Sequence, residues 1–219
     1  EGQPHAGSYA VENGWVTIAA DGKSYTFEAK PNIPETTTSQ EITFQMTDAD
    51  GDTDTATVTV TLQQATPPET PEAVKVEEAA LSSGSNPDSN AEYAAVSIEG
   101  YTIIAGGTGT YGNISQVNGQ WTYTLTNAVT GTTQDDGAQW TGSDSVTITV
   151  KDAHNNTFEV EVPVSIKDDV PTVTASNISV VEGNISGSAA ITPIYGSDIP
   201  EGSTVVVKDG TLIAEGQPH

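Results

Sequence analysis

The sequence predicts an all-β protein built from tandem repeats. Three observations support this fold class: apolar and polar residues alternate with a period of two, good helix formers never run far, and a long internal repeat is present. A hydrophobic content of 35% and several Trp and Tyr residues distinguish the chain from a disordered acidic tail. We therefore expect a folded protein with apolar cores.

Two hairpins carry the clearest strand patterns. Residues 41–46 and 55–62 alternate around one short polar turn, and residues 145–150 and 159–166 alternate around another. Each pair predicts a β-hairpin with one face on a core. Pro163 cannot donate a ladder hydrogen bond, so its strand lies at an edge or its nitrogen points outward.

The two hairpins are copies of one unit. An offset of 104 residues aligns them and continues without a gap from Ile42/Val146 to Leu81/Ile185. A register held over this length indicates duplication. Weaker matches with small gaps extend the repeat upstream, at Gly22/Gly119, Tyr9/Tyr111, Tyr25/Tyr123 and Phe27/Leu125.

This repeat divides the chain into three parts. Residues 72–166 form a complete repeat, residues 172–219 hold the first strands of a further repeat, and residues 1–66 hold the last strands of another. The pentapeptide Glu-Gly-Gln-Pro-His occurs at 1–5 and again at 215–219, and residues 212–214 resemble 103–105, as in an array cut out of phase. The alternative is that the pentapeptides are additions unrelated to the fold.

In the array interpretation, residues 1–66 lack their opening strands and leave an edge unpaired. We therefore expect this segment to pair with a 172–219-type segment, from its own chain or from a neighbouring one.

The charge balance excludes several classes of partner. Thirty Asp and Glu residues face six Lys and no Arg, which gives a net charge of −24. Nucleic-acid binding requires a basic surface that this chain cannot assemble, and an anionic membrane surface is disfavoured for the same reason. No apolar run is long enough to insert into a membrane. The absence of cysteine removes disulfides, thiolate metal sites and thiol catalysis.

The strongest candidate metal site is the tip of the first hairpin. Four carboxylates lie within seven residues, at Asp48, Asp50, Asp52 and Asp54, around Gly51. Alternating oxygen ligands around a glycine turn suit Ca²⁺, which accepts six to eight oxygens in variable geometry. The alternative is a solvated turn, because Asp and Gly are also turn formers. The corresponding turn of the second hairpin keeps only Asp152, which predicts weaker cation binding there.

A second candidate lies in the linker after residue 166. Asp168 and Asp169 precede Pro171, and Glu182 follows one predicted strand later. Carboxylates on both sides of a junction can share a cation and limit bending, although an Asp pair can also simply keep a linker soluble. The corresponding linker before Pro67 has Ala65 in place of Asp169, which predicts a junction less dependent on metal. Asp135-Asp136 forms a third pair, for which a polar turn is favoured over a cation site.

Enzymatic chemistry has little support. The three histidines form no zinc-hydrolase pattern, and no Gly-x-Ser-x-Gly sequence occurs. The acids cluster in turns and linkers, away from strand positions that would line a cleft. Trp15, Trp121 and Trp140 could form a sugar-stacking platform, but Trp121 alternates within a strand, which favours a cross-strand or core role.

Residues 47–60, followed by the Asp168-Asp169-Val170-Pro171 junction, resemble the extender repeats of giant bacterial RTX adhesins. The resemblance implies tandem Ig-like or cadherin-like β-sandwiches secreted by type I machinery. It also implies Ca²⁺ within and between the domains, with Asp48, Asp50, Asp52 and Asp54 as intradomain ligands and Asp168, Asp169 and Glu182 as linker ligands. The turn after Asp152 and the linker at Ala65 depart from the expected pattern.

Two functions follow from these expectations. The first is a calcium-rigidified spacer of a cell-surface adhesin, whose partners are neighbouring repeats and whose biological role is attachment and biofilm formation. The second is a carbohydrate- or peptide-binding module of such an adhesin, with Trp140 or Tyr111 beside a cation. A salt-adapted acidic surface is a third interpretation, in which the acids would be spread evenly.

Overall fold

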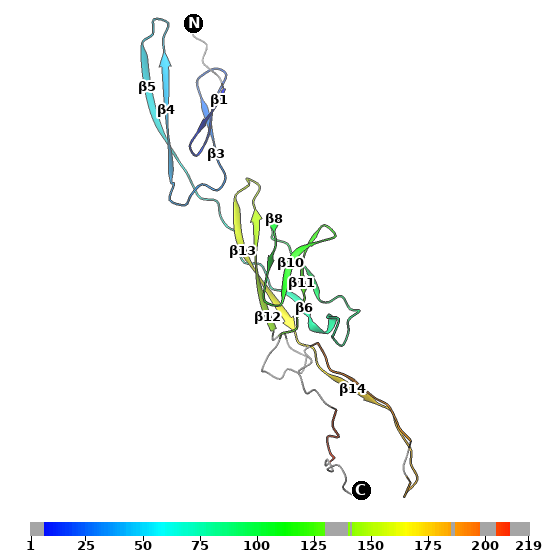
Figure 1. The fold of residues 1–219 in the computed structure, drawn as a ribbon. Helices are drawn as coiled ribbons and strands as arrows, with labels where there is room; N and C mark the ends of the chain where they lie inside the picture. The colour runs from blue at the N-terminus through cyan, green and yellow to red at the C-terminus, as the bar shows by residue number, and fades with distance from the viewer. Residues whose placement is uncertain (1–6, 130–139, 141, 185–186, 198–204, 211–219) are drawn as a thin grey trace. The chain divides into compact units, whose positions relative to one another are not determined.

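A computed structural model describes residues 7–129, 140, 142–184, 187–197 and 205–210 (Figure 1). Regular structure in these residues is β apart from one 3₁₀ turn at Glu78–Ala80. The chain divides into two compact units. Unit 1 comprises Glu1–Glu69, Ile98–Ile104 and Thr149–Glu159; unit 2 comprises Thr70–Ser97, Ala105–Ile148 and Val160–His219.

The first repeat (residues 1–66) contains five described strands in two sheets. An antiparallel sheet of order β1-β2-β3 is followed by a separate hairpin of β4 and β5. Val16, Ile42 and Leu62 are its buried apolar side chains. The strands are β1 (Gly7–Val11), β2 (Gly14–Ile18), β3 (Tyr25–Ala29), β4 (Ser39–Thr47) and β5 (Thr53–Thr61).

The second repeat (residues 72–166) supplies eight strands in two four-stranded sheets, of order β7-β11-β10-β9 and β6-β13-β12-β8. The alternating residues of β12 and β13 place Val146, Ile148, Val162 and Ile166 in the core, each at most 1% exposed. The strands are β6 (Val74–Glu77), β7 (Tyr93–Ala95), β8 (Thr102–Ala105), β9 (Gly107–Thr108), β10 (Gly112–Val117), β11 (Gln120–Leu125), β12 (Gly142–Lys151) and β13 (Thr157–Lys167).

The pairing of β6 with β13 explains how Pro163 is tolerated. β6 runs parallel to β13 and pairs with it only from Val164 to Lys167. Pro163 lies just before this ladder begins, so no hydrogen bond with β6 is required of it.

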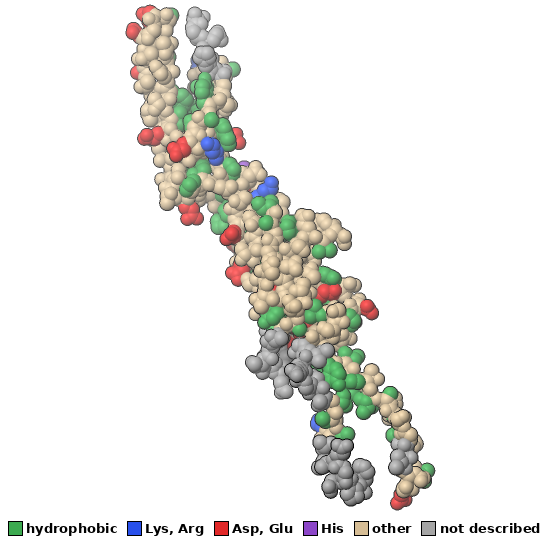
Figure 2. Space-filling model, in the orientation of Figure 1, with side chains coloured by type: hydrophobic (Ala, Val, Ile, Leu, Met, Phe, Trp, Pro, Cys, Tyr) green, Lys and Arg blue, Asp and Glu red, His purple; other side chains and the backbone are tan. Residues whose placement is uncertain are grey.

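The third segment (residues 172–219) is described as one antiparallel pair, β14 (Thr172–Ala175) with β15 (Ile191–Ile194). Its apolar side chains are largely exposed: Val173 is 59%, Val180 57% and Val181 72% accessible. Figure 2 shows hydrophobic side chains gathered on the surface around β14. Residues 211–219 and 1–6, including both pentapeptides, lie outside the described residues.

Packing in the two repeats corrects the weaker sequence matches. Gly14 lies against Phe27 as Gly112 lies against Tyr123: a Cβ at either glycine would come within 2.5 Å of the opposite aromatic ring. Val16 pairs with Phe27, and Ile114 pairs with Tyr123. Tyr123 therefore corresponds to Phe27 in the structure. The sequence match of Tyr123 with Tyr25 is wrong by two residues, and so is the match of Phe27 with Leu125.

The predicted all-β fold and both hairpins are confirmed: three predicted segments fall inside β4, β12 and β13, and the segment 55–62 extends one residue past the end of β5. The two four-stranded sheets of the second repeat give the predicted β-sandwich architecture. Among the described residues, no helix is long and apolar enough to cross a membrane.

Candidate metal centre

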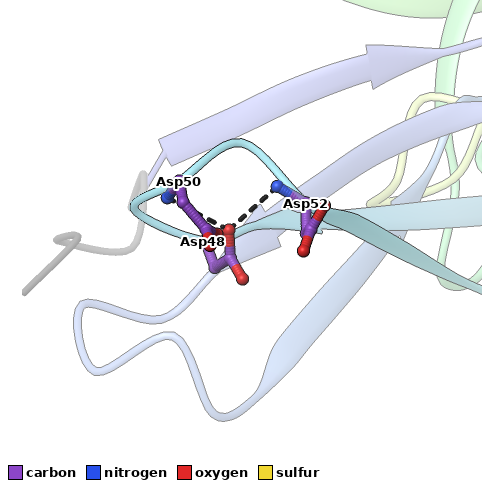
Figure 3. A group of neighbouring side chains, drawn as sticks. All are labelled: Asp48, Asp50 and Asp52. Carbon is purple, nitrogen blue, oxygen red and sulfur yellow. Dashed lines mark hydrogen bonds between the residues drawn. The ribbon is translucent and has the colours of Figure 1, made fainter.

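The tip of the β4–β5 hairpin is organised by the carboxylate of Asp48 (Figure 3). Its Oδ1 accepts hydrogen bonds from the backbone N–H groups of Asp50 (3.3 Å), Gly51 (3.1 Å) and Asp52 (2.9 Å). The Asp48 N–H in turn donates to the Asp52 carbonyl oxygen at 2.9 Å, which closes the turn. Gly51 adopts a φ of 100°, a conformation that favours glycine.

These contacts keep Asp48 ionised. A hydrogen bond with the Asp50 side chain, together with the backbone N–H groups of Asp52, Asp50 and Gly51, lowers the pKa of Asp48 below its ordinary value. The carboxylate is therefore a negatively charged oxygen donor throughout the neutral pH range.

The structure brings together three of the four predicted ligands at this tip. Asp48, Asp50 and Asp52 each offer a carboxylate oxygen, and these atoms lie within 4.8 Å of one another. All three side chains are exposed. Asp54 is not part of this trio and lies on β5, where it pairs with Met46. The donor chemistry suits a hard cation such as Ca²⁺, but Oδ1 of Asp48 already accepts three N–H groups.

Asp152 forms the same turn with different neighbours. Its Oδ1 accepts the N–H groups of His154 (2.8 Å) and Asn156 (2.9 Å), and its Oδ2 accepts the Asn156 side-chain amide at 2.7 Å. These bonds, with the Asn156 side chain first, lower the pKa of Asp152. An amide donor thus satisfies the second oxygen here, where the first hairpin has the carboxylate of Asp52.

The three predicted linker ligands differ in how deeply they are buried. Asp169 is buried, at 4% exposure, and accepts hydrogen bonds from the backbone N–H (2.8 Å) and the hydroxyl of Ser85. Asp168 is half-buried, and Glu182 is exposed. In the described part of the chain, Asp168, Asp169 and Glu182 do not form a trio of converging carboxylates like that at the hairpin tip.

A buried acid that the sequence-based candidates omitted lies beside this linker. Glu78 is fully buried; its Oε1 accepts the N–H of Val129 at 2.6 Å, and its Oε2 accepts the Ser197 hydroxyl at 3.2 Å. Ser83 donates to the Ser197 carbonyl oxygen at 3.3 Å. Glu78 corresponds to Glu182 at the offset of 104, so the repeat itself carried a signal for this position.

A second buried acid, Asp144, has a structural role that sequence reasoning did not identify. Its carboxylate accepts the N–H groups of Thr110 (2.8 Å), Tyr111 (2.9 Å) and Gly112 (3.1 Å), and the Tyr123 hydroxyl at 2.8 Å. Burial raises the pKa of Asp144, but these donors more than offset it, so the pKa lies below its ordinary value. Burial beside this carboxylate strongly raises the pKa of Tyr123, which remains a donor.

The three tryptophans considered for ligand stacking differ in their exposure and in their contacts. Trp140 is 40% exposed, with the Lys75 ammonium 5.4 Å from its ring centroid, and Trp15 is similarly covered by Lys30 at 5.8 Å. Trp121 is half-buried on β11, opposite Gln116. Asp135 and Asp136 lie outside the described residues.

Comparison with known proteins gives one family. The bacterial Ig domain family matches residues 3–61. No curated protein matches the chain. This match covers β1 to β5. Through the internal repeat, β9 to β13 have the same strand order and pairing. The family is non-enzymatic and is typical of extracellular surface proteins. The match and the architecture together support a bacterial Ig-like repeat protein, a structural or adhesion module of a surface protein.

Proposed function

We propose that this chain is a spacer of a bacterial cell-surface adhesin of the RTX type, and that bound Ca²⁺ stiffens it. The chain would be secreted, and its repeats would extend a ligand-binding region away from the cell during attachment and biofilm formation. The observation that carries the metal part of the proposal is the convergence of Asp48, Asp50 and Asp52 at one hairpin tip.

Electrostatics gives the reason for a cation at this tip. Three carboxylates with oxygen atoms within 4.8 Å repel one another, and the net charge of −24 adds to this repulsion. A divalent cation bound by Asp48, Asp50 and Asp52 would offset the repulsion and fix the turn. Asp168, Asp169 and Glu182 are the proposed ligands at the linker.

Calcium binding would stabilise the fold by mass action. A site with a dissociation constant near 10⁻⁵ M, in millimolar extracellular calcium, adds about 2.7 kcal/mol to the free energy of unfolding. This is a large fraction of the stability of a small domain without disulfides.

Thermal unfolding of the chain in calcium and in EGTA tests the proposal. We expect a higher unfolding temperature in calcium, and we expect the combined variant Asp48→Asn, Asp50→Asn, Asp52→Asn to lose most of that increase. An unchanged midpoint for the unsubstituted protein would remove calcium from the function and leave an acidic surface adapted to salt.

A matched control separates ligation from net charge. The variant Glu12→Gln, Glu28→Gln, Glu35→Gln removes the same number of negative charges from exposed positions outside the trio. It should keep the full response to calcium. If both triple variants lose the response equally, diffuse charge screening explains it, and the hairpin tip is not the site.

A further inference from the structure

The tip of the β12–β13 hairpin contacts the first repeat within unit 1. This unit contains Thr149–Glu159 of the hairpin together with Glu1–Glu69. The side-chain Oδ1 of Asn32 accepts the backbone N–H of Thr157 at 2.7 Å and the Thr157 hydroxyl at 3.1 Å. In the other direction, the Asn32 N–H donates to Oδ1 of Asn156 at 3.0 Å. Asn32 therefore both accepts from and donates to one hairpin tip that is distant in the sequence.

The loop between β3 and β4 favours the conformation in which Asn32 makes these contacts. Asn32 has a φ of 57°, in the left-handed region that asparagine adopts more readily than most residues. Pro31 precedes it and Pro34 follows two residues later, so the backbone on both sides is restricted. The Pro34 carbonyl oxygen accepts the N–H of Thr37 at 2.8 Å, which closes the next turn. Local residues thus prepare the loop for the hairpin tip.

On the hairpin, the carboxylate of Asp152 fixes the orientation of the Asn156 amide. The Asn156 side-chain N–H donates to Oδ2 of Asp152 at 2.7 Å, and an ionised carboxylate can only accept hydrogen bonds. The amide oxygen of Asn156 must then point away from Asp152, where it accepts the Asn32 N–H. The N–H of Thr157 is not part of the ladder with β6, which begins at Val164. Both partners of Asn32 are therefore available at the start of β13.

A second contact in the same unit involves the next residue of β13. The Tyr101 hydroxyl donates to the Thr66 carbonyl oxygen at 2.8 Å. The Tyr101 ring lies edge-on to Phe158, with a centroid distance of 5.8 Å. Phe158 directly follows Thr157, so the hydrogen bonds of Asn32 and this aromatic contact involve adjacent residues. The β3–β4 loop and the end of the first repeat thus both contact the second repeat.

The first hairpin lacks the amide on which this arrangement depends. At the offset of 104, Asp52 occupies the position of Asn156, and Asp48 that of Asp152. An ionised Asp52 has no proton to donate to Asp48, and the two side chains carry like charges. The amide of Asn156 therefore satisfies Asp152 with a hydrogen bond at the place where the first hairpin has a second carboxylate.

We propose that Asn32, Asn156 and Thr157 form a latch that holds the first repeat to the second without a metal ion. Each hydrogen bond is exposed and contributes little alone, so the latch depends on three bonds that converge on one residue. This inference goes beyond the calcium-dependent stiffening proposed above, because it concerns other residues and should hold in EGTA. The latch would limit bending at the junction whose linker has Ala65 in place of Asp169.

Amide hydrogen exchange in EGTA tests the latch. Asn32→Gly removes the acceptor and keeps the left-handed backbone, so the Thr157 amide should exchange about 10- to 100-fold faster than in the unsubstituted protein. Asn32→Asp keeps an acceptor oxygen and should retain the protection. Asn118→Gly is the matched control, because Asn118 has a φ of 51° in the β10–β11 turn, outside the latch. It should leave the exchange of Thr157 unchanged.

A substitution on the hairpin tests the role of the amide. Asn156→Asp recreates the carboxylate pair of the first hairpin beside Asp152. It removes the donor to Asp152 and places two like charges together, so exchange of the Thr157 amide in EGTA should accelerate about tenfold. Asn118→Asp adds the same charge at an exposed turn and should have no such effect.

Relaxation of the backbone amides, measured by NMR, tests the mechanical consequence. In the unsubstituted protein, the amides of β5 and those of the β12–β13 hairpin should report one rotational motion. The combined variant Asn32→Gly, Thr157→Val removes the acceptor and the hydroxyl donor. The two sets of amides should then report different rotational correlation times.

Three results would overturn the proposal. One is a Thr157 amide that exchanges as fast in the unsubstituted protein as in Asn32→Gly, and another is equal acceleration by Asn32→Gly and Asn118→Gly. The third is separate rotational motion of the two sets of amides in the unsubstituted protein in EGTA. Loss of the calcium response alone would affect the spacer proposal and leave this inference intact.

Discussion

Asp144 shows how one buried carboxylate fixes a loop against a β-sheet. It accepts three consecutive backbone N–H groups, from Thr110 to Gly112, and the hydroxyl of Tyr123. In the first repeat Gln40 takes the corresponding position and accepts the N–H of Asn13 at 3.0 Å, while Phe27 replaces the tyrosine. The hydroxyl and the negative charge therefore occur together in one repeat and are absent together in the other.

Replacing this carboxylate should destabilise the second repeat. Asp144→Asn turns one acceptor into a donor facing buried N–H groups, so we expect the free energy of unfolding to fall by about 1–3 kcal/mol in a urea titration. Tyr123→Phe should cost only about 1 kcal/mol, because Phe27 shows that the ring fits without its hydroxyl. Equal losses in the two variants would contradict this account.

The loss should depend on pH. The folded-state pKa of Asp144 lies below the ordinary value of 3.8, so its contribution to stability is present above that pH and disappears as the pH falls through the folded-state pKa. The difference in free energy of unfolding between the natural protein and Asp144→Asn should therefore be largest near neutral pH and shrink below about pH 4. A difference that grows on acidification would show that the charge is not stabilising.

At the level of the element, the two hairpin tips have the same backbone with different side chains. Gly51 and Asn155 occupy corresponding positions, with φ values of 100° and 64°. In both turns the first Asp accepts the N–H of the residue four positions on, at 2.9 Å. The turn geometry thus belongs to the repeat, whereas the cluster of acids belongs to the first hairpin alone.

The second repeat supplies the control for a substitution at this turn. Gly51→Asn should leave stability nearly unchanged, because asparagine adopts the left-handed conformation at the corresponding site. Gly51→Val should cost about 1–2 kcal/mol, since a β-branched side chain is disfavoured there. Chemical denaturation in EGTA measures both effects without metal binding. If valine is tolerated as well as asparagine, the turn does not hold this φ in solution.

Across the whole molecule, the same repeat position is buried in one place and exposed in another. Val76→Ala should reduce the free energy of unfolding by about 1.5–3 kcal/mol, because Val76 is fully buried beside β13. Val180→Ala should change it by less than about 0.5 kcal/mol, because Val180 is 57% exposed. Urea titrations of the two variants test this, and equal losses of stability would contradict the difference in burial.

The arrangement of charge is also a property of the whole molecule. On the face shown in Figure 2, acidic side chains are distributed along the surface as well as at the turns. The trio at Asp48, Asp50 and Asp52 is a local exception to this spread. In the part of the chain that the structure describes, the acidic residues therefore combine a dispersed surface (Figure 2) with one converging cluster.

The β class, the two hairpins and the acidic turn could all be predicted from the amino-acid sequence. These features are local: a period of two places alternate side chains on one face, and Asp48, Asp50 and Asp52 lie close enough in sequence to meet at one turn, whereas Asp54 lies on β5. The offset of 104 also identified Glu78 and Glu182 as equivalent positions. It gave no indication of what surrounds either residue.

Which acids are buried depends on contacts between residues far apart in the sequence. Asp144 and Asp169 accept hydrogen bonds from residues 32–34 and 84 positions away, respectively, and no local pattern specifies such pairings. The correspondence of Tyr123 with Phe27 likewise required the contact of each ring with its glycine.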